Sequence, residues 1–242
     1  MTQGQVKLCI STPCPIIPSA GGTRLAPITM EWHRARMRLT SPFGYNTAEI
    51  GMDGYEVGEA RSKVVSHARE IGAEFLFFLD YDVLPPSNAI KQLVYRLTAT
   101  HTHCDVAAGV YCVKEDPAVP IIFKGWNCGP FWDWKVGDVL DEGITGVPMG
   151  CTLLRLSLFD RLPQTEEKPW FKTVCLDDEI GPHGTMTEDV WFCKRATEET
   201  GAKIVVDTSV LCGHIDNKTG AIYQLPEDSP PIVRSGLKLV AA

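Results

Sequence analysis

A short, almost wholly apolar segment between two helical patterns constrains most strictly what this chain can fold into. Residues 74–79 read EFLFFL, and the run ends abruptly at Asp80-Tyr81-Asp82 before two prolines. Apolar residues on both faces are typical of a strand buried inside a parallel sheet. Apolar residues recur at helical spacing before it, in residues 56–71, and after it, in residues 88–98. This order of helix, strand and helix predicts an α/β fold.

The rest of the chain extends the same alternation. Further strands are predicted at residues 6–12, 105–113, 120–123, 150–156 and 203–206, and further helices at residues 29–39, 158–162 and 187–200. Ser87 and Thr187 are predicted to cap the helices that follow them. Strands that alternate with helices predict a mostly parallel central sheet flanked by helices, in one domain.

Charge and cysteine usage limit the partners of this chain. The sequence carries 30 acidic and 23 basic residues, a formal net charge of -7, and the basic residues do not gather into a long run. Nucleic acids need a concentrated positive field, so none is expected as a partner. The nine cysteines show no zinc-site or disulfide spacing and are predicted to be reduced core residues. No secretory leader or membrane-spanning run is recognisable, so we expect a cytoplasmic protein.

The acidic pair at the end of the buried strand is the strongest candidate site. Ligands of open α/β sheets collect outside the carboxyl ends of the strands, where Asp80 and Asp82 follow residues 74–79. Two carboxylates there repel each other unless a cation lies between them. Mg²⁺ and Mn²⁺ prefer oxygen ligands and often share them with a diphosphate. The alternative is an ordinary acidic turn, because the same spacing also occurs by chance.

Several segments in order resemble the GT-A glycosyltransferases, especially those similar to family 2. They are Ala60-Arg61-Ser62-Lys63, the run from Phe77 to Asp82, Gly146-Val147-Pro148-Met149-Gly150 and Thr187-Glu188-Asp189-Val190-Trp191. The resemblance implies a single GT-A type domain. Its nucleotide-sugar and metal-binding half would span about residues 1–115, its acceptor-binding half about 116–224, and a tail residues 225–242.

The resemblance also implies a donor site. Asp80 and Asp82 would hold Mn²⁺ or Mg²⁺ against the diphosphate of a UDP- or GDP-sugar, with Tyr81 between them in the same site. His214 would supply a third metal ligand. Arg61 would contact phosphate or orient the acidic pair, although Ser62 stands where the family commonly has asparagine.

Further positions in the resemblance concern the nucleotide and the acceptor. Pro13, in the loop after the first strand, and Asp53 would surround the base and ribose. Asp189 would be the general base that removes a proton from an acceptor hydroxyl during inverting transfer, or alternatively Glu188 would face the acceptor. Both also fit an ordinary acidic first turn of a helix.

Three other functions remain open at this point. A retaining glycosyltransferase of the same fold would use the same metal site. A sugar-phosphate nucleotidyltransferase would bring a phosphate loop, which the segment from Gly21 to Ala26 faintly resembles. The third is a non-catalytic module that binds a sugar nucleotide or a glycan.

Overall fold

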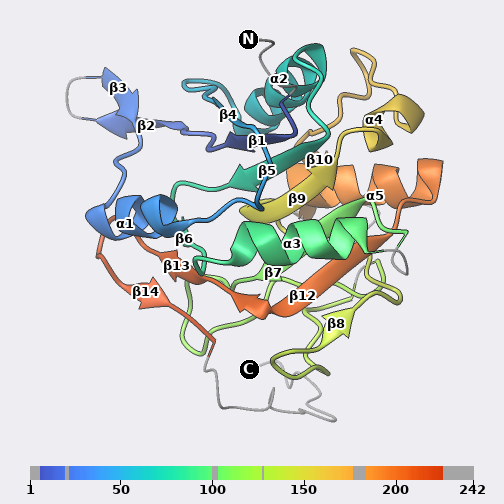
Figure 1. Cartoon of the computed structure of the whole chain (residues 1–242). Coiled ribbons are helices and arrows are strands. Elements are labelled where there is room, and N and C mark those ends of the chain that lie inside the picture. Colours follow the sequence, from blue (N-terminus) through green and yellow to red (C-terminus); the bar gives the residue numbers. More distant parts are fainter. Residues whose placement is uncertain (1–5, 20–21, 100–102, 127, 177–183, 226–242) are drawn as a thin grey trace.

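The structure, a computed structural model, describes residues 6–19, 22–99, 103–126, 128–176 and 184–225. A seven-stranded sheet forms its centre, in the order β4-β1-β5-β9-β7-β12-β8 (Figure 1). Its strands are β1 (Leu8–Ser11), β4 (Thr47–Ile50), β5 (Phe75–Leu79), β7 (Val106–Val110), β8 (Val139–Leu140), β9 (Cys151–Arg155) and β12 (Ile204–Leu211).

The sheet is mixed but mostly parallel, as predicted. The strands β4, β1 and β5 pair in parallel, and so do β7 and β12. The strand β9 is antiparallel to both of its neighbours, β5 and β7, and β8 is antiparallel to β12. All the other strands therefore run in one direction, and their carboxyl ends meet at one edge.

The strand β5 shows why the sheet has two covered faces. All five of its residues are fully buried, and successive side chains of a strand point to opposite faces. Phe75, Phe77 and Leu79 belong to the core on one face, whereas Leu76 and Phe78 belong to the core on the other. The continuous apolar run predicted from the sequence is thus shared between two layers.

Helices cover both faces of the sheet. The helices α1 (Met30–Arg38) and α3 (Ala89–Thr98) pack on the face that contains Phe77, and α3 crosses the front of the sheet in Figure 1. The helices α2 (Val57–Glu70), α4 (Leu158–Arg161) and α5 (Glu188–Thr200) pack on the opposite face. The α/β architecture with flanking helices is therefore confirmed.

Local sequence accounts for most helix ends. The Thr29 side chain accepts a hydrogen bond from the backbone of Trp32 and caps α1. The Glu56 carboxylate accepts bonds from the first turn of α2, which ends before Gly72 at a φ of 72°. That left-handed conformation costs glycine little.

Three local predictions differ from the structure in whole or in part. The helix α3 begins at Ala89 with Asn88 at its N-cap position, and Ser87 does not cap it. Thr187 is the N-cap residue of α5, as predicted, but its side chain bonds the Asp189 carboxylate instead of a backbone N–H group. Residues 120–123 form isolated bridges rather than a strand, because their pairing changes from Cys112 to loop residues within four positions.

Smaller sheets complete the described chain. One contains β6 (Val83–Leu84), β13 (Gly213–Ile215) and β14 (Ile222–Tyr223), and the two others are the hairpins of β2 (Ile16–Ser19) with β3 (Gly22–Leu25) and of β10 (Val174–Leu176) with β11 (Gly184–Met186).

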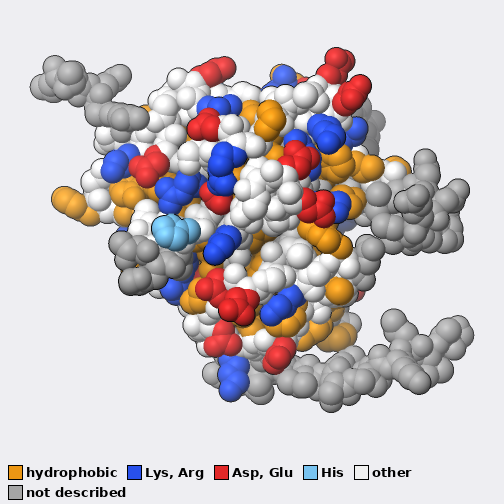
Figure 2. Space-filling view, turned by 90° about the vertical axis from the view of Figure 1, so that its right-hand side faces the viewer, with side chains coloured by type: hydrophobic (Ala, Val, Ile, Leu, Met, Phe, Trp, Pro, Cys, Tyr) orange, Lys and Arg blue, Asp and Glu red, His pale blue; other side chains and the backbone are white. Residues whose placement is uncertain are grey.

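The surface and the cysteines agree with the composition. Figure 2 shows basic and acidic side chains interspersed over one face of the molecule. All nine cysteines are free. Seven of them are buried, as predicted, whereas Cys128 and Cys175 are exposed. In the part of the chain that the structure describes, no helix is long and apolar enough to cross a membrane.

Candidate active site

The acidic pair lies in a turn whose backbone is held from three sides. The Asp80 N–H group donates to the carbonyl of Gly150 at 3.0 Å. The Asp80 carbonyl in turn accepts from the indole Nε1 of Trp32 at 2.8 Å and from the backbone of Val83 at 3.1 Å. The turn that follows β5 is therefore tied to β9, to α1 and to β6.

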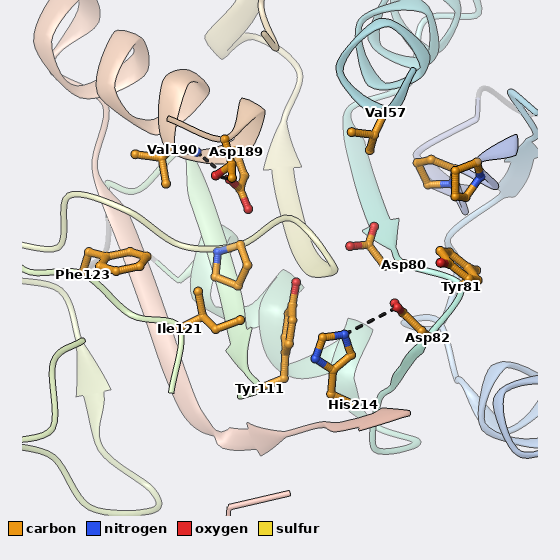
Figure 3. A pocket seen from close by; sticks show the side chains of 14 residues that line it. Val57, Asp80, Tyr81, Asp82, Tyr111, Ile121, Phe123, Asp189, Val190 and His214 are labelled. Atoms are coloured by element: carbon orange, nitrogen blue, oxygen red, sulfur yellow. Dashed lines mark hydrogen bonds and ion pairs between the residues drawn. The ribbon is translucent and has the colours of Figure 1, made fainter. Parts of the chain in front are cut away.

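A pocket of about 370 Å³ opens at this edge of the sheet. Figure 3 shows Asp80, Tyr81 and Asp82 on one wall, Asp189 and Val190 of α5 on the opposite wall, and Tyr111 and His214 between them. The remaining lining residues include Pro13, Pro15, Val57, Ile121, Phe123, Pro148 and Thr187. Residues far apart in the sequence thus share one cavity.

His214 reaches Asp82 through the small sheet beside the pocket. In the antiparallel pair of β13 and β6, His214 lies opposite Val83, the residue after Asp82. Its Nε2 lies 3.6 Å from Asp82 Oδ2, and its Nδ1 lies 2.8 Å from the carbonyl of Cys112. A carbonyl can only accept, so Nδ1 carries a proton and donates to Cys112, and Nε2 is the ring nitrogen that faces Asp82.

Lys114 contacts the same carboxylate and was not predicted from the sequence. Its Nζ donates to Asp82 Oδ2 at 2.6 Å. Burial alone would raise the pKa of Asp82, but the contacts with His214 and Lys114 outweigh burial and hold the pKa below its usual value. No local pattern marks Lys114, because it lies in the irregular segment after β7.

Arg61 lies behind the pocket, where it joins two acidic residues. Its guanidinium donates to Asp80 Oδ1 at 2.7 Å and to Glu188 Oε1, and the residue is only 2% exposed. Burial opposes its charge, but the carboxylates of Asp80 and Glu188 outweigh burial and raise the pKa of Arg61 further. Of the two roles predicted for Arg61, the geometry supports orientation of the acids, since the buried guanidinium is bound to both carboxylates.

Negative charge exceeds fixed positive charge around the pocket. Burial raises the pKa of Glu188 to about 7 despite Arg61, with Asp189 and Asp80 adding to the rise. Burial, together with Asp82 and Asp189, also raises the pKa of Asp80 above its usual value. The carboxyl groups of Asp80, Asp82, Glu188 and Asp189 therefore share two basic side chains, Arg61 and Lys114, an imbalance that a divalent cation would relieve.

Asp189 lies opposite the acidic pair. Its Oδ1 accepts from the Thr187 hydroxyl and from the backbone of Val190 at 2.8 Å. Its Oδ2 has no hydrogen-bond partner among the described residues. One carboxylate oxygen is thus held in place and the other remains able to accept a proton.

The residues fit a cation that is shared with a ligand. Asp82 Oδ2 and His214 Nε2 are close enough to contact one ion, and Asp80 lies beside them in the same wall. No group of three or more His, Cys, Asp or Glu side chains in the described ranges could hold a metal ion by itself. Such a site would need ligand oxygens, as Mg²⁺ sites with substrate phosphates do.

Gly150 allows β9 to approach the acidic pair. A Cβ atom at this position would lie 2.5 Å from the Tyr111 hydroxyl and 2.9 Å from Asp80 Oδ2. The Gly150 N–H group instead donates to that hydroxyl at 3.1 Å. Burial, with nearby carboxylates, raises the pKa of Tyr111 well above its usual value, so the phenol stays protonated.

The predicted nucleotide contacts are divided between the pocket and its margin. Pro13 and Tyr81 line the pocket, and burial raises the pKa of Tyr81 to about 12. Asp53 is exposed outside it, but its backbone bridges Cys14 between two lining prolines. The predicted site residues therefore gather around one cavity, with Arg61 and Glu188 buried behind it and Asp53 at its edge.

Comparisons with solved structures bear on the fold. A197 from STIV is similar over 91% of this chain and 95% of its own, at 16% identity and a TM-score of 0.53. TarS from S. aureus, as fragment 1–349, is similar over 85% of this chain and 59% of the fragment, at 14% identity and a TM-score of 0.48. A complex of the same fragment with UDP-GlcNAc gives 12% identity and a TM-score of 0.46, over 85% of this chain and 57% of the fragment.

Comparisons of the sequence itself add no relative. No protein-family model matches the chain, and no curated protein does. The similarity to A197 from STIV covers nearly the whole of both chains, so this chain shares the architecture of that protein.

Proposed function

We propose that this protein is a metal-dependent glycosyltransferase that moves a sugar from a UDP- or GDP-sugar to a hydroxyl acceptor. One observation carries the proposal. The acidic pair lies on one wall of the pocket with His214 next to it, and Asp189 faces the pair from the other wall with a carboxylate oxygen that bonds no other described residue. Transfer between two substrates needs a site for the leaving group and a base for the acceptor, and the two walls supply both.

Asp82 and His214 are the residues that would hold the cation, with Asp80 beside them. A bound Mn²⁺ or Mg²⁺ would neutralise charge that develops on the departing nucleoside diphosphate. His214 donates through Nδ1 to the carbonyl of Cys112, which orients the ring toward Asp82. Arg61 donates to both Asp80 and Glu188 from behind the pocket, so it links the two walls and fixes their relative position.

Asp189 is the proposed general base. The Asp189 oxygen that bonds no other described residue accepts the proton of the acceptor hydroxyl, while the oxygen of that hydroxyl attacks the anomeric carbon. The bond between the anomeric carbon and the diphosphate oxygen breaks, and its electron pair leaves with the nucleoside diphosphate. One displacement of this kind inverts the anomeric configuration. The apolar side chains of Ile121, Phe123 and Pro148 line the pocket and are placed to receive a face of a sugar.

The geometry favours this reading over a nucleotidyltransferase. Such an enzyme would use a glycine-rich phosphate loop near the first strand. Within the candidate segment, Gly22–Leu25 instead forms the exposed strand β3, which pairs with β2. A non-catalytic binding module would have no use for Asp189 opposite the acidic pair.

A screen of UDP- and GDP-sugars with Mn²⁺ tests the proposal. We expect at least one donor to raise the unfolding temperature only when the metal is present, and to be slowly hydrolysed to nucleoside diphosphate. The anomeric coupling constant of a transfer product then decides between inversion and retention. Stabilisation without release of diphosphate with any acceptor would favour the binding module. Release of pyrophosphate from a nucleoside triphosphate and a sugar phosphate would favour the nucleotidyltransferase.

A further inference from the structure

Lys114 contacts the same oxygen of Asp82 that a bound cation would contact. Its Nζ lies 2.6 Å from Asp82 Oδ2, and His214 Nε2 lies 3.6 Å from the same oxygen. The ammonium group and His214 Nε2 therefore converge on one carboxylate oxygen of Asp82. A divalent cation at that oxygen and a lysine in hydrogen-bond contact with it would repel each other strongly.

Lys114 differs from Arg61 in its freedom to move. The Arg61 side chain is 3% exposed and bound to two carboxylates, whereas the Lys114 side chain is 31% exposed and makes one ion pair with the described residues. A lysine carries a compact charge on a flexible stem and can exchange one oxygen partner for another. Arg61 is thus a permanent counter-ion, and Lys114 is one that can be displaced.

We infer that Lys114 is the counter-ion of Asp82 in the ligand-free protein, leaves Asp82 when a divalent cation binds, and then donates to the diphosphate of the nucleotide. This inference rests on the proposed function. Lys114 would oppose binding of the metal alone and support binding of the metal together with the nucleotide. Metal and nucleotide would therefore strengthen each other's binding, and Lys114 would supply part of that coupling.

Mn²⁺ binding measured by electron paramagnetic resonance tests this role without any turnover. Mn²⁺ is titrated alone, and then with UDP or GDP, into the wild-type protein and four variants. Lys114→Met removes the charge, Lys114→Arg keeps it, Lys91→Met removes an exposed charge on α3, and Asp82→Asn removes the ligand. Thermal unfolding of each variant checks that it is folded.

We expect Lys114→Met to bind Mn²⁺ alone about tenfold more tightly than the wild type, within the usual range of coupling between sites. The factor by which the nucleotide tightens Mn²⁺ binding should fall by about the same amount. Lys114→Arg should bind Mn²⁺ alone no more tightly than the wild type, and Lys91→Met should behave as the wild type.

The variants separate the failure of this role from the failure of the proposed function. Unchanged or weaker Mn²⁺ binding by Lys114→Met, with binding lost in Asp82→Asn, would overturn the role of Lys114 and leave the metal site intact. Equal Mn²⁺ binding by the wild type and Asp82→Asn, or no binding by any protein, would overturn the metal site and this role with it. If Lys114→Met is unfolded, Lys114→Gln decides by the same criteria.

Discussion

His214 Nε2 lies 3.6 Å from Asp82 Oδ2, although the two residues come from opposite halves of the sequence. The contact follows from a strand pair, since His214 lies opposite Val83 in the antiparallel ladder of β13 and β6. The hydrogen bond of His214 Nδ1 to Cys112 leaves Nε2 directed at the carboxylate. The two side chains therefore form the core of the proposed metal site.

Removing either ligand should abolish metal-dependent binding of the nucleotide. We expect Mn²⁺ affinity to fall about 100-fold or more in Asp82→Asn and about 10- to 100-fold in His214→Asn. Isothermal titration calorimetry measures both values. The exposed residue Asp133 provides a matched control, because Asp133→Asn makes the same chemical change away from the pocket. Retained affinity in Asp82→Asn would place the metal elsewhere.

Asp189→Asn should slow transfer while leaving donor binding intact. The amide cannot take the acceptor proton, so kcat should fall by about 10²- to 10⁴-fold. The KM for the donor should stay within about threefold, because Asp189 acts on the acceptor. Glu198→Gln, on the exposed side of the same helix, is the control. A kcat close to the wild-type value would assign the base to another residue.

Arg61→Met should lower the free energy of unfolding more than the loss of any surface ion pair does. Asp80 and Glu188 would remain partly buried without their cation, at a cost of about 3–5 kcal/mol in the free energy of unfolding. Arg69→Met breaks the exposed pair with Asp160 and should cost about 1 kcal/mol or less. Urea denaturation measures the free energy of unfolding of both variants. Equal losses would show that the buried triad contributes no special stability.

The pH dependence of stability should reveal Glu188. Burial raises its pKa from 4.5 to about 7, so the folded protein holds a proton there that the unfolded chain releases. The stabilisation that this bound proton provides is complete below the pKa of Glu188 in the unfolded chain, and it is lost as the pH rises through the pKa of Glu188 in the folded protein.

Glu188→Gln is the variant that tests this effect. Between pH 4.5 and 7 in the absence of metal, the wild type should lose on the order of 1–3 kcal/mol of unfolding free energy relative to it. Urea midpoints at several pH values measure the difference. Parallel pH profiles for the two proteins would contradict the raised pKa, and Glu70→Gln, on the exposed surface of α2, should parallel the wild type.

Gly150→Ala should disturb the site through Tyr111. The new methyl group would lie 2.5 Å from the Tyr111 hydroxyl, so side chains must shift, at a cost of about 1–3 kcal/mol. Tyr111→Phe removes that hydroxyl and also its bond with the Gly150 backbone. The double variant should therefore be more stable than the sum of the single changes predicts. Additive losses in a double-mutant cycle would show that the clash is relieved elsewhere.

Local patterns in the sequence were sufficient for much of the fold. The run that became β5 and the helices α1 and α2 were all predicted near their observed positions, because apolar periodicity acts over a few residues. Prediction was wrong where the outcome depended on distant partners. Residues 120–123 pair one residue at a time with separate loops, and no local pattern encodes that.

The sequence by itself determined that this chain would form an α/β sheet with two carboxylates at the end of a buried strand. Only the tertiary structure decided which side chains would surround them. His214 arrives through the β13–β6 ladder, Lys114 through an irregular segment after β7, and Arg61 through the packing of α2 against β5 and α5. Helix and strand formation depends on neighbours in the sequence, whereas these contacts depend on how distant elements pack together.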